Sequence, residues 1–179
     1  MDPRYVIATA RARDVRALAA IELAAAALLE GHAPNSVLNE TTDESELRDA
    51  QAEGRLWVAL EGDVPVGFAL VEMLATDLPH LEEVGVHPLH GRRGVGTALV
   101  RAVCRWVHRS GYSQITLTTF RAVPWNMPFY AKLGFREVPA RDLRPELAAV
   151  VRNETARGLD PDARVVMSHR RTTPFTPSA

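Results

Sequence analysis

The sequence has very little cysteine, because Cys104 is the only one among 179 residues. A single cysteine cannot form a disulfide within the chain, and no group of cysteine and histidine residues has the spacing of a zinc site. The sequence therefore excludes disulfide scaffolds and zinc fingers. We expect a fold that depends on its hydrophobic core and a site that needs no metal.

An excess of one charge and a long apolar run are also missing. Lys and Arg number 21 against 22 Asp and Glu, so the net charge of -1 offers no basic surplus for a nucleic acid backbone. The longest apolar stretch, 17–29, is interrupted by Glu22 and is shorter than the roughly 18 residues of a membrane span. Residues 1–4 do not resemble an export signal. We expect a cytoplasmic protein without nucleic acid or membrane partners.

Helical and strand patterns alternate along the chain without a long linker or a repeat. The predicted strands are 5–8, 56–60, 64–71, 81–87, 114–119 and 164–168. The predicted helices are 13–30, 42–54, 94–110, 128–133 and 143–156. With 46% hydrophobic residues, the chain can bury one sizeable core. We expect an α/β or α+β fold on a mixed sheet, with one domain over residues 1–171 and a loose tail over 172–179.

A glycine-rich junction lies between the predicted strand 81–87 and helix 94–110, with the sequence Gly91-Arg92-Arg93-Gly94-Val95-Gly96-Thr97. Glycine lets the backbone approach a ligand, and the first amides of a helix have no partner within the helix, so the junction is a candidate anion site. The alternative is that these glycines only form a turn and a helix start.

Two common phosphate motifs do not fit this junction. A P-loop requires Lys followed by Ser or Thr after its last glycine, but Gly96 is followed by Thr97 and Ala98. The dinucleotide fingerprint requires a third glycine at a position that Leu99 occupies. The sequence therefore argues against both nucleotide folds.

The junction resembles the pyrophosphate loop Gln/Arg-x-x-Gly-x-Gly/Ala of the GNAT superfamily of acyl-CoA-dependent N-acetyltransferases. Gly94 and Gly96 match its two glycines, whereas Gly91 stands at its first position. Residues 129–135, Phe-Tyr-Ala-Lys-Leu-Gly-Phe, resemble the family's aromatic-Tyr-x-Lys-Leu-Gly-Phe block, and residues 118–126 resemble one bacterial subgroup. The resemblance extends from Tyr5 to about Val138.

The resemblance implies a mixed, mostly antiparallel sheet of six to seven strands, flanked by helices, in which the fourth and fifth strands splay apart. It also implies acetyl-CoA as cofactor, with CoA as product. The main chain of two valines would contact pantetheine and the thioester carbonyl, and the amides of residues 92–97, with the Thr97 hydroxyl, would hold the pyrophosphate. The residues that we expect to contact the cofactor are Val84, Val86, Arg92, Arg93, Gly94, Val95, Gly96, Thr97, Asn126, Phe129 and Tyr130.

Transfer to an amine requires a group that removes a proton, because an alkyl ammonium has a pKa near 10. Glu82 and Glu83 are adjacent in a predicted strand, so one should face the cleft and the other should point away. Glu82 falls where some family members carry a basic glutamate, and we expect it to be the base. The alternatives are a chain of water molecules and the histidines His80 and His87.

Tyr130 occupies the family's general-acid position, where a phenol gives a proton to the departing thiolate; the alternative is that its ring only packs. Phe129 is expected to pack. Asn126 either caps the short helix that follows or bonds to pantetheine. Cys104 has the spacing of a buried helix residue, so it is expected to be a small core residue and not a nucleophile.

These residues predict an N-acetyltransferase that acts by direct attack in a ternary complex on a primary amine of a small molecule or a protein or peptide N-terminus. The acceptor should meet the first two predicted helices and residues 31–42, 77–80 and 121–127. Acids such as Asp43, Glu46 and Asp77 either attract a cationic amine or form a solvated surface. A homodimer is possible. The alternative function is a CoA-sensing or regulatory module with weak catalysis on the same fold.

Overall fold

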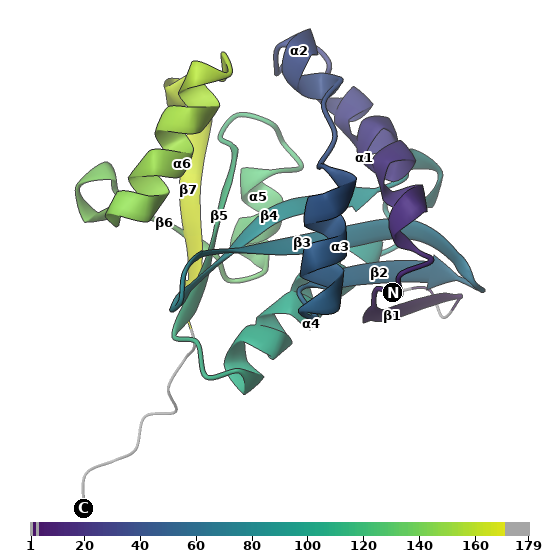
Figure 1. The fold of residues 1–179 in the computed structure, drawn as a ribbon. Coiled ribbons are helices and arrows are strands. Elements are labelled where there is room, and N and C mark those ends of the chain that lie inside the picture. The colour runs from purple at the N-terminus through teal and green to yellow at the C-terminus, as the bar shows by residue number, and fades with distance from the viewer. Residues whose placement is uncertain (1, 3, 171–179) are drawn as a thin grey trace, which may run out of the picture.

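The computed structural model describes residues 2 and 4–170, and Figure 1 shows how their elements are arranged. One sheet contains seven strands in the order β1-β2-β3-β4-β5-β7-β6. The strands are β1 (Tyr5–Thr9), β2 (Leu56–Glu61), β3 (Val64–Ala75), β4 (Leu78–Val86), β5 (Gln114–Phe120), β6 (Arg136–Glu137) and β7 (Arg164–Arg170). The predicted mixed α/β fold with a six- to seven-stranded sheet is confirmed.

The pairing of β4 with β5 is the exception in an otherwise antiparallel sheet. The two strands run parallel, and their register contains one residue pair, His80 with Thr116. Beyond that pair the strands diverge, so no ladder joins the last residues of β4 to β5 within the described part of the chain. The predicted splay of the fourth and fifth strands is therefore confirmed, and the gap opens toward the carboxyl ends of both strands.

Helices cover both faces of the sheet (Figure 1). They are α1 (Leu18–Ala26), α2 (Asn35–Leu38), α3 (Glu44–Ala52), α4 (Val95–Arg109), α5 (Met127–Lys132) and α6 (Pro145–Ala156). A core with Leu18 and Leu47 fixes α1 and α3 against one face of the sheet. A second core with Leu99 and Val103 fixes α4 against the opposite face, and α5 packs on the same side. The site described below lies where β4 and β5 separate between these two layers.

The long helix α4 shows how the sequence determines its element. Leu99, Val103 and Val107 recur every four residues and are fully buried, as expected for the apolar face of a helix. Gly94 precedes the helix with φ +80° and Gly111 follows it with φ +83°, a region of backbone angles that glycine adopts without a steric penalty. Cys104 is half-buried in this helix and packs against the core, as predicted.

The structure corrects three expectations about local structure. Residues 35–38 form the short helix α2, which is absent from the predicted helices. The strand β4 begins at Leu78, three residues before its predicted start, so 78–80 belong to the sheet and are not an acceptor loop. The strand accepts Pro79 because the register between β3 and β4 is irregular there. The short β6 was not predicted.

Two further expectations were a loose tail at the C-terminus and the absence of a membrane-spanning helix. The predicted tail, 172–179, lies outside the described residues. Among residues 2 and 4–170, no helix combines the length and the apolar character that crossing a membrane requires.

Candidate active site

The gap between β4 and β5 opens into a cavity of about 1200 Å³. One end of the cavity is formed by the loop that follows β4 and by the first turn of α4, together with residues of α5. The other end is formed by α1, by residues 37–46 and by α6. The cavity therefore passes through the split in the sheet and connects its two faces.

The first end is built to receive an anion. No side chain caps α4, whose preceding residue is Gly94, so the first amides of this 15-residue helix are open to a ligand. Arg92 adopts φ +56°, the one positive value outside glycine in the described residues, and lines the cavity. Arg93 turns away instead, because its guanidinium donates to the Tyr5 hydroxyl at 2.9 Å. Positive charge at this end thus comes from Arg92 and the helix dipole.

Most of the predicted cofactor residues lie around this cavity. Those that line it are Val84, Val86, Arg92, Gly94, Val95, Gly96, Thr97, Asn126, Phe129 and Tyr130. Gly96 faces the ring of Phe129, since a Cβ there would lie 3.7 Å from Cζ of that ring. Of the predicted cofactor residues, Arg93 alone does not line the cavity. Its guanidinium is therefore not placed to contact a cofactor there, although its backbone belongs to the loop before α4.

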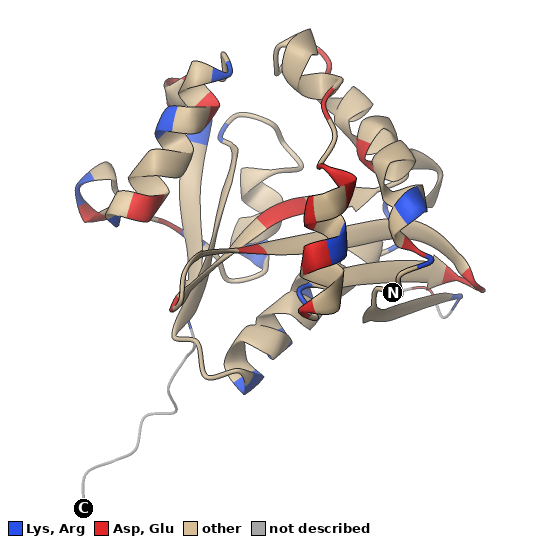
Figure 2. Ribbon diagram, in the orientation of Figure 1, with Lys and Arg blue, Asp and Glu red and all other residues tan. Residues whose placement is uncertain are grey.

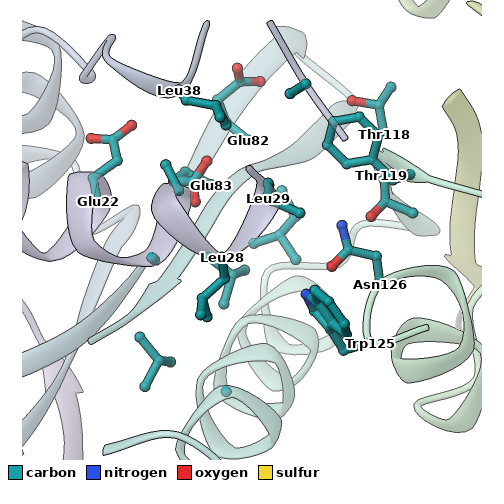
Figure 3. A pocket seen from close by; sticks show the side chains of 18 of the residues that line it. Glu22, Leu28, Leu29, Leu38, Glu82, Glu83, Thr118, Thr119, Trp125 and Asn126 are labelled. Carbon is teal, nitrogen blue, oxygen red and sulfur yellow. The ribbon is translucent and has the colours of Figure 1, made fainter. Parts of the chain in front are cut away.

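Glu82 and Glu83 both line the cavity, and Figure 3 shows the two carboxylates at its centre. The expectation that one of them points away is wrong. Leu70 of β3 pairs with Glu83, but the next residue of β3 pairs with Leu81, so Glu82 is an extra residue in a β-bulge. A bulge interrupts the alternation of side chains, and here it brings neighbouring carboxylates to the same cavity.

Burial and like charge disturb both carboxyl groups. The pKa of Glu82 is raised to about 7, first by burial and then by the charge of Glu72. The pKa of Glu83 is raised to about 8, first by burial and then by the charge of Glu22. At neutral pH each group therefore exists partly as the acid and partly as the carboxylate, which suits a group that accepts a proton and releases it again.

His80 precedes Glu82 by two residues in β4 and is 1% exposed. Its Nδ1 is 2.9 Å from the Thr116 hydroxyl, and its Nε2 is 3.7 Å from a carboxylate oxygen of Glu82. Burial lowers the pKa of His80 to about 4, so the imidazole is neutral. His80 lines no part of the cavity, and His87 accepts from the Leu89 amide at 3.4 Å beyond the strand end.

Tyr130 projects from α5 into the cavity. Its ring packs against Phe129 and Phe135, with centroids 5.0 Å and 5.6 Å away. Burial, followed by the charge of Glu83, raises the pKa of Tyr130, so the phenol keeps its proton. Asn126 lies at the N-cap of α5 but makes no capping bond with its side chain, whose amide faces the cavity (Figure 3).

Several residues at the second end were not predicted as site residues. Glu22 accepts from the Thr42 amide and hydroxyl, both at 3.0 Å, and faces the cavity from α1. Its signal in the sequence was its position as the one charge in an apolar stretch. Glu154 and Arg164 form an ion pair at 2.6 Å on the opposite wall, with the Thr118 hydroxyl donating to Glu154. Asp77, expected either to attract a cationic amine or to form a solvated surface, is exposed and pairs with Arg144 outside the cavity, in agreement with the second expectation.

Comparison with known sequences identifies the family. Residues 6–135 match the Acetyltransferase (GNAT) family. A protein named mycothiol acetyltransferase, from Nocardiopsis dassonvillei, is 35% identical over 124 residues, which cover 55% of this chain and 37% of that protein. The chain thus spans little more than a third of the length of this relative.

Solved structures show the same fold at low sequence identity. PaiA N-acetyltransferase from Thermoplasma acidophilum, solved in complex with coenzyme A, superposes with a TM-score of 0.72 at 14% identity, covering 93% of this chain and 99% of that one. The ribosomal-protein-S18-alanine N-acetyltransferase from Escherichia coli gives a TM-score of 0.66 at 19% identity, covering 98% and 99%. Since the family match extends over more than half of its residues, the chain belongs to the Acetyltransferase (GNAT) family.

Proposed function

We propose that this protein is an acetyl-CoA-dependent N-acetyltransferase that acts on a primary amine of a small molecule or of a protein or peptide N-terminus. One observation carries the proposal: a single cavity joins an uncapped helix N-terminus to two carboxylates and a phenol through a split sheet. We infer that residues 1–171 act as one acetyltransferase domain, because both ends of this cavity belong to the same sheet and its covering helices.

The residues present fit acetyl-CoA. The open amides at residues 94–97 and the Arg92 guanidinium would hold the pyrophosphate, and the Thr97 hydroxyl would add a bond. The main chain of Val84 and Val86, on the edge of β4 that faces the gap, would pair with pantetheine as an added strand. Phe129 would pack against the cofactor. Solved structures of similar fold contain coenzyme A, which supports this assignment.

Bound acetyl-CoA supplies the acetyl group as a thioester. Glu82 would remove a proton from the acceptor ammonium, directly or through water, so that the nitrogen lone pair is available. The Val84 amide would donate to the thioester oxygen as negative charge develops there; one well-placed donor of this kind contributes roughly 3 kcal/mol. Tyr130 would give its proton to the sulfur. A C–N bond forms and a C–S bond breaks. Of the two protons that the ammonium nitrogen loses, one would leave through Glu82 to solvent and the other would replace, through water, the proton that Tyr130 gave.

Direct attack in a ternary complex is supported by the surroundings of the only thiol. Cys104 packs within α4 against the core, and burial raises its pKa to about 11. It does not line the cavity. A thiol in this environment is a poor nucleophile, so an acetyl-cysteine intermediate is not required.

The proposal is tested by calorimetric titration of the protein with acetyl-CoA, with NADH and ATP as controls. We expect saturable binding of acetyl-CoA alone, followed by thiol release when a primary amine is added. The alternative, a CoA-sensing module, predicts tight binding without thiol release for any amine. Absence of acetyl-CoA binding would contradict both functions.

A further inference from the structure

The acceptor end of the cavity is strongly acidic. Figure 2 shows acidic residues on α1, on α3 and on the neighbouring length of β4. The carboxylates that line the cavity are Glu22, Glu40, Asp43, Glu46, Glu82, Glu83 and Glu154. Three arginines line it as well, and Arg92 lies at the opposite, cofactor end. Charge therefore changes sign along the cavity.

Three of these acids already have partners. Glu40 forms an ion pair with Arg157, and Glu154 forms one with Arg164. Asp43 caps α3 by accepting from the Ser45 amide at 2.7 Å. The two arginines at this end, Arg157 and Arg164, are therefore paired with glutamates that line the cavity and are not available to an acidic acceptor.

Four carboxylates remain without a lysine or arginine partner among the described residues: Glu22, Glu46, Glu82 and Glu83. They interact with one another, because Glu46 raises the pKa of Glu22 and Glu22 raises that of Glu83. Burial and like charge therefore favour the protonated forms of Glu22, Glu82 and Glu83 in the empty site, and a bound cation would favour their ionised forms.

A second feature also points to a ligand at this end. Thr119 of β5 is 4% exposed, lines the cavity, and makes no side-chain hydrogen bond with any described residue. Figure 3 shows its side chain directed into the cavity, across from Glu82 and Glu83. A buried hydroxyl with an open acceptor is suited to an ammonium N–H. Leu29 and Leu38 line the space between the charged groups and offer apolar surface for an alkyl chain.

We propose that the acceptor is an alkyl amine carrying a second positive charge, a diamine or polyamine, whose distal ammonium is held by Glu22 and Glu46 while the reacting nitrogen lies at Glu82 and Glu83. This proposal rests on the proposed function and specifies its substrate class. Glu22 and Glu46 come from α1 and α3, so they set specificity from the face of the sheet opposite the pyrophosphate loop.

The test uses three amines of equal chain length: 1,4-diaminobutane, butylamine and 4-aminobutanoate. Dissociation constants are measured by calorimetry with the full chain, and kcat/KM is measured with acetyl-CoA by thiol release. We expect 1,4-diaminobutane to exceed butylamine by at least tenfold in both quantities and 4-aminobutanoate to be the poorest ligand. The preference should shrink as salt is raised, because Coulomb attraction is screened.

Variants assign the preference to the two acids. Glu22→Gln and Glu46→Gln should each lower the ratio of diamine to monoamine affinity by about tenfold. Glu44→Gln is the matched control, since Glu44 lies on the same helix as Glu46 but pairs with Arg48 outside the cavity, and the ratio should not change. Substitution by glutamine keeps the size of the side chain, and a melting temperature for each variant verifies folding.

The outcomes separate this inference from the proposed function. If acetyl-CoA binds and butylamine equals 1,4-diaminobutane, or if no amine binds, the inference is overturned and cofactor binding stands. If acetyl-CoA does not bind but the ratio of diamine to monoamine affinity depends on Glu22 and Glu46, these acids still bind the distal ammonium, and the acetyltransferase proposal fails. Preference for 4-aminobutanoate would also overturn the inference.

Discussion

Tyr130 is a residue whose role depends on keeping a proton. Burial and the charge of Glu83 raise its pKa, so the phenol is protonated at any pH used in an assay and can act as an acid. We predict that Tyr130→Phe lowers kcat by about 10²-fold, a typical contribution of a general acid, while the Kd of CoA changes less than about twofold. Tyr112→Phe, outside the cavity, is the control. Equal losses of turnover and affinity would make Tyr130 a binding residue.

At the same scale, sequence motifs predicted residues that line the cavity, whereas residues that only the fold brings together were missed. Tyr130 and Gly94 were predicted because each lies in a contiguous block. Glu22 was missed because its neighbours in the cavity come from other elements. Glu83 was assigned to the wrong face, since regular alternation was assumed and the bulge that breaks it depends on the register with β3.

At the scale of elements, the junction between β4 and α4 has a backbone conformation that depends on a glycine. Gly94 has φ +80° and is the N-cap residue of α4. We predict that Gly94→Glu raises the Kd of acetyl-CoA at least 100-fold, because a carboxylate then occupies the anion site. Gly94→Ala is the matched variant, since it shares the backbone strain of about 1–2 kcal/mol without the charge. Calorimetric titration of both measures the difference, and equal affinities would refute the pyrophosphate assignment.

Elements with strong periodicity were predicted within a few residues of their observed bounds, as α4 illustrates. The weaker predictions concern segments fixed by tertiary contacts. The helix α2 has four residues, too few to show a period, and Leu38 within it is buried. The first residues of β4 contain Pro79, a residue that usually argues against a strand, and yet Leu78 and His80 are buried on either side of it.

For the whole molecule, the acidic cavity makes stability depend on pH. The pKa of Glu83 rises from 4.5 to about 8 on folding, so between these values the native state binds more protons than the unfolded chain. The free energy of unfolding then falls as pH rises, and this loss is complete above pH 8. His80 acts in the opposite sense, but only below its ordinary pKa of 6.5. Between pH 6.5 and 8 the carboxyl groups therefore dominate, and the protein should lose stability.

Glu83→Gln removes the group that causes this loss. At pH 8.5 we predict that the variant melts about 2–4 °C above the natural protein, the shift expected for about 1 kcal/mol in a domain of this size, and that the difference vanishes near pH 4.5. Melting temperatures measured from pH 4.5 to 8.5 provide the comparison. Glu30→Gln, at an exposed site, should show no such trend. A gain that is equal at both ends of the range would mean that packing, and not the buried carboxylate, limits the stability of this cavity.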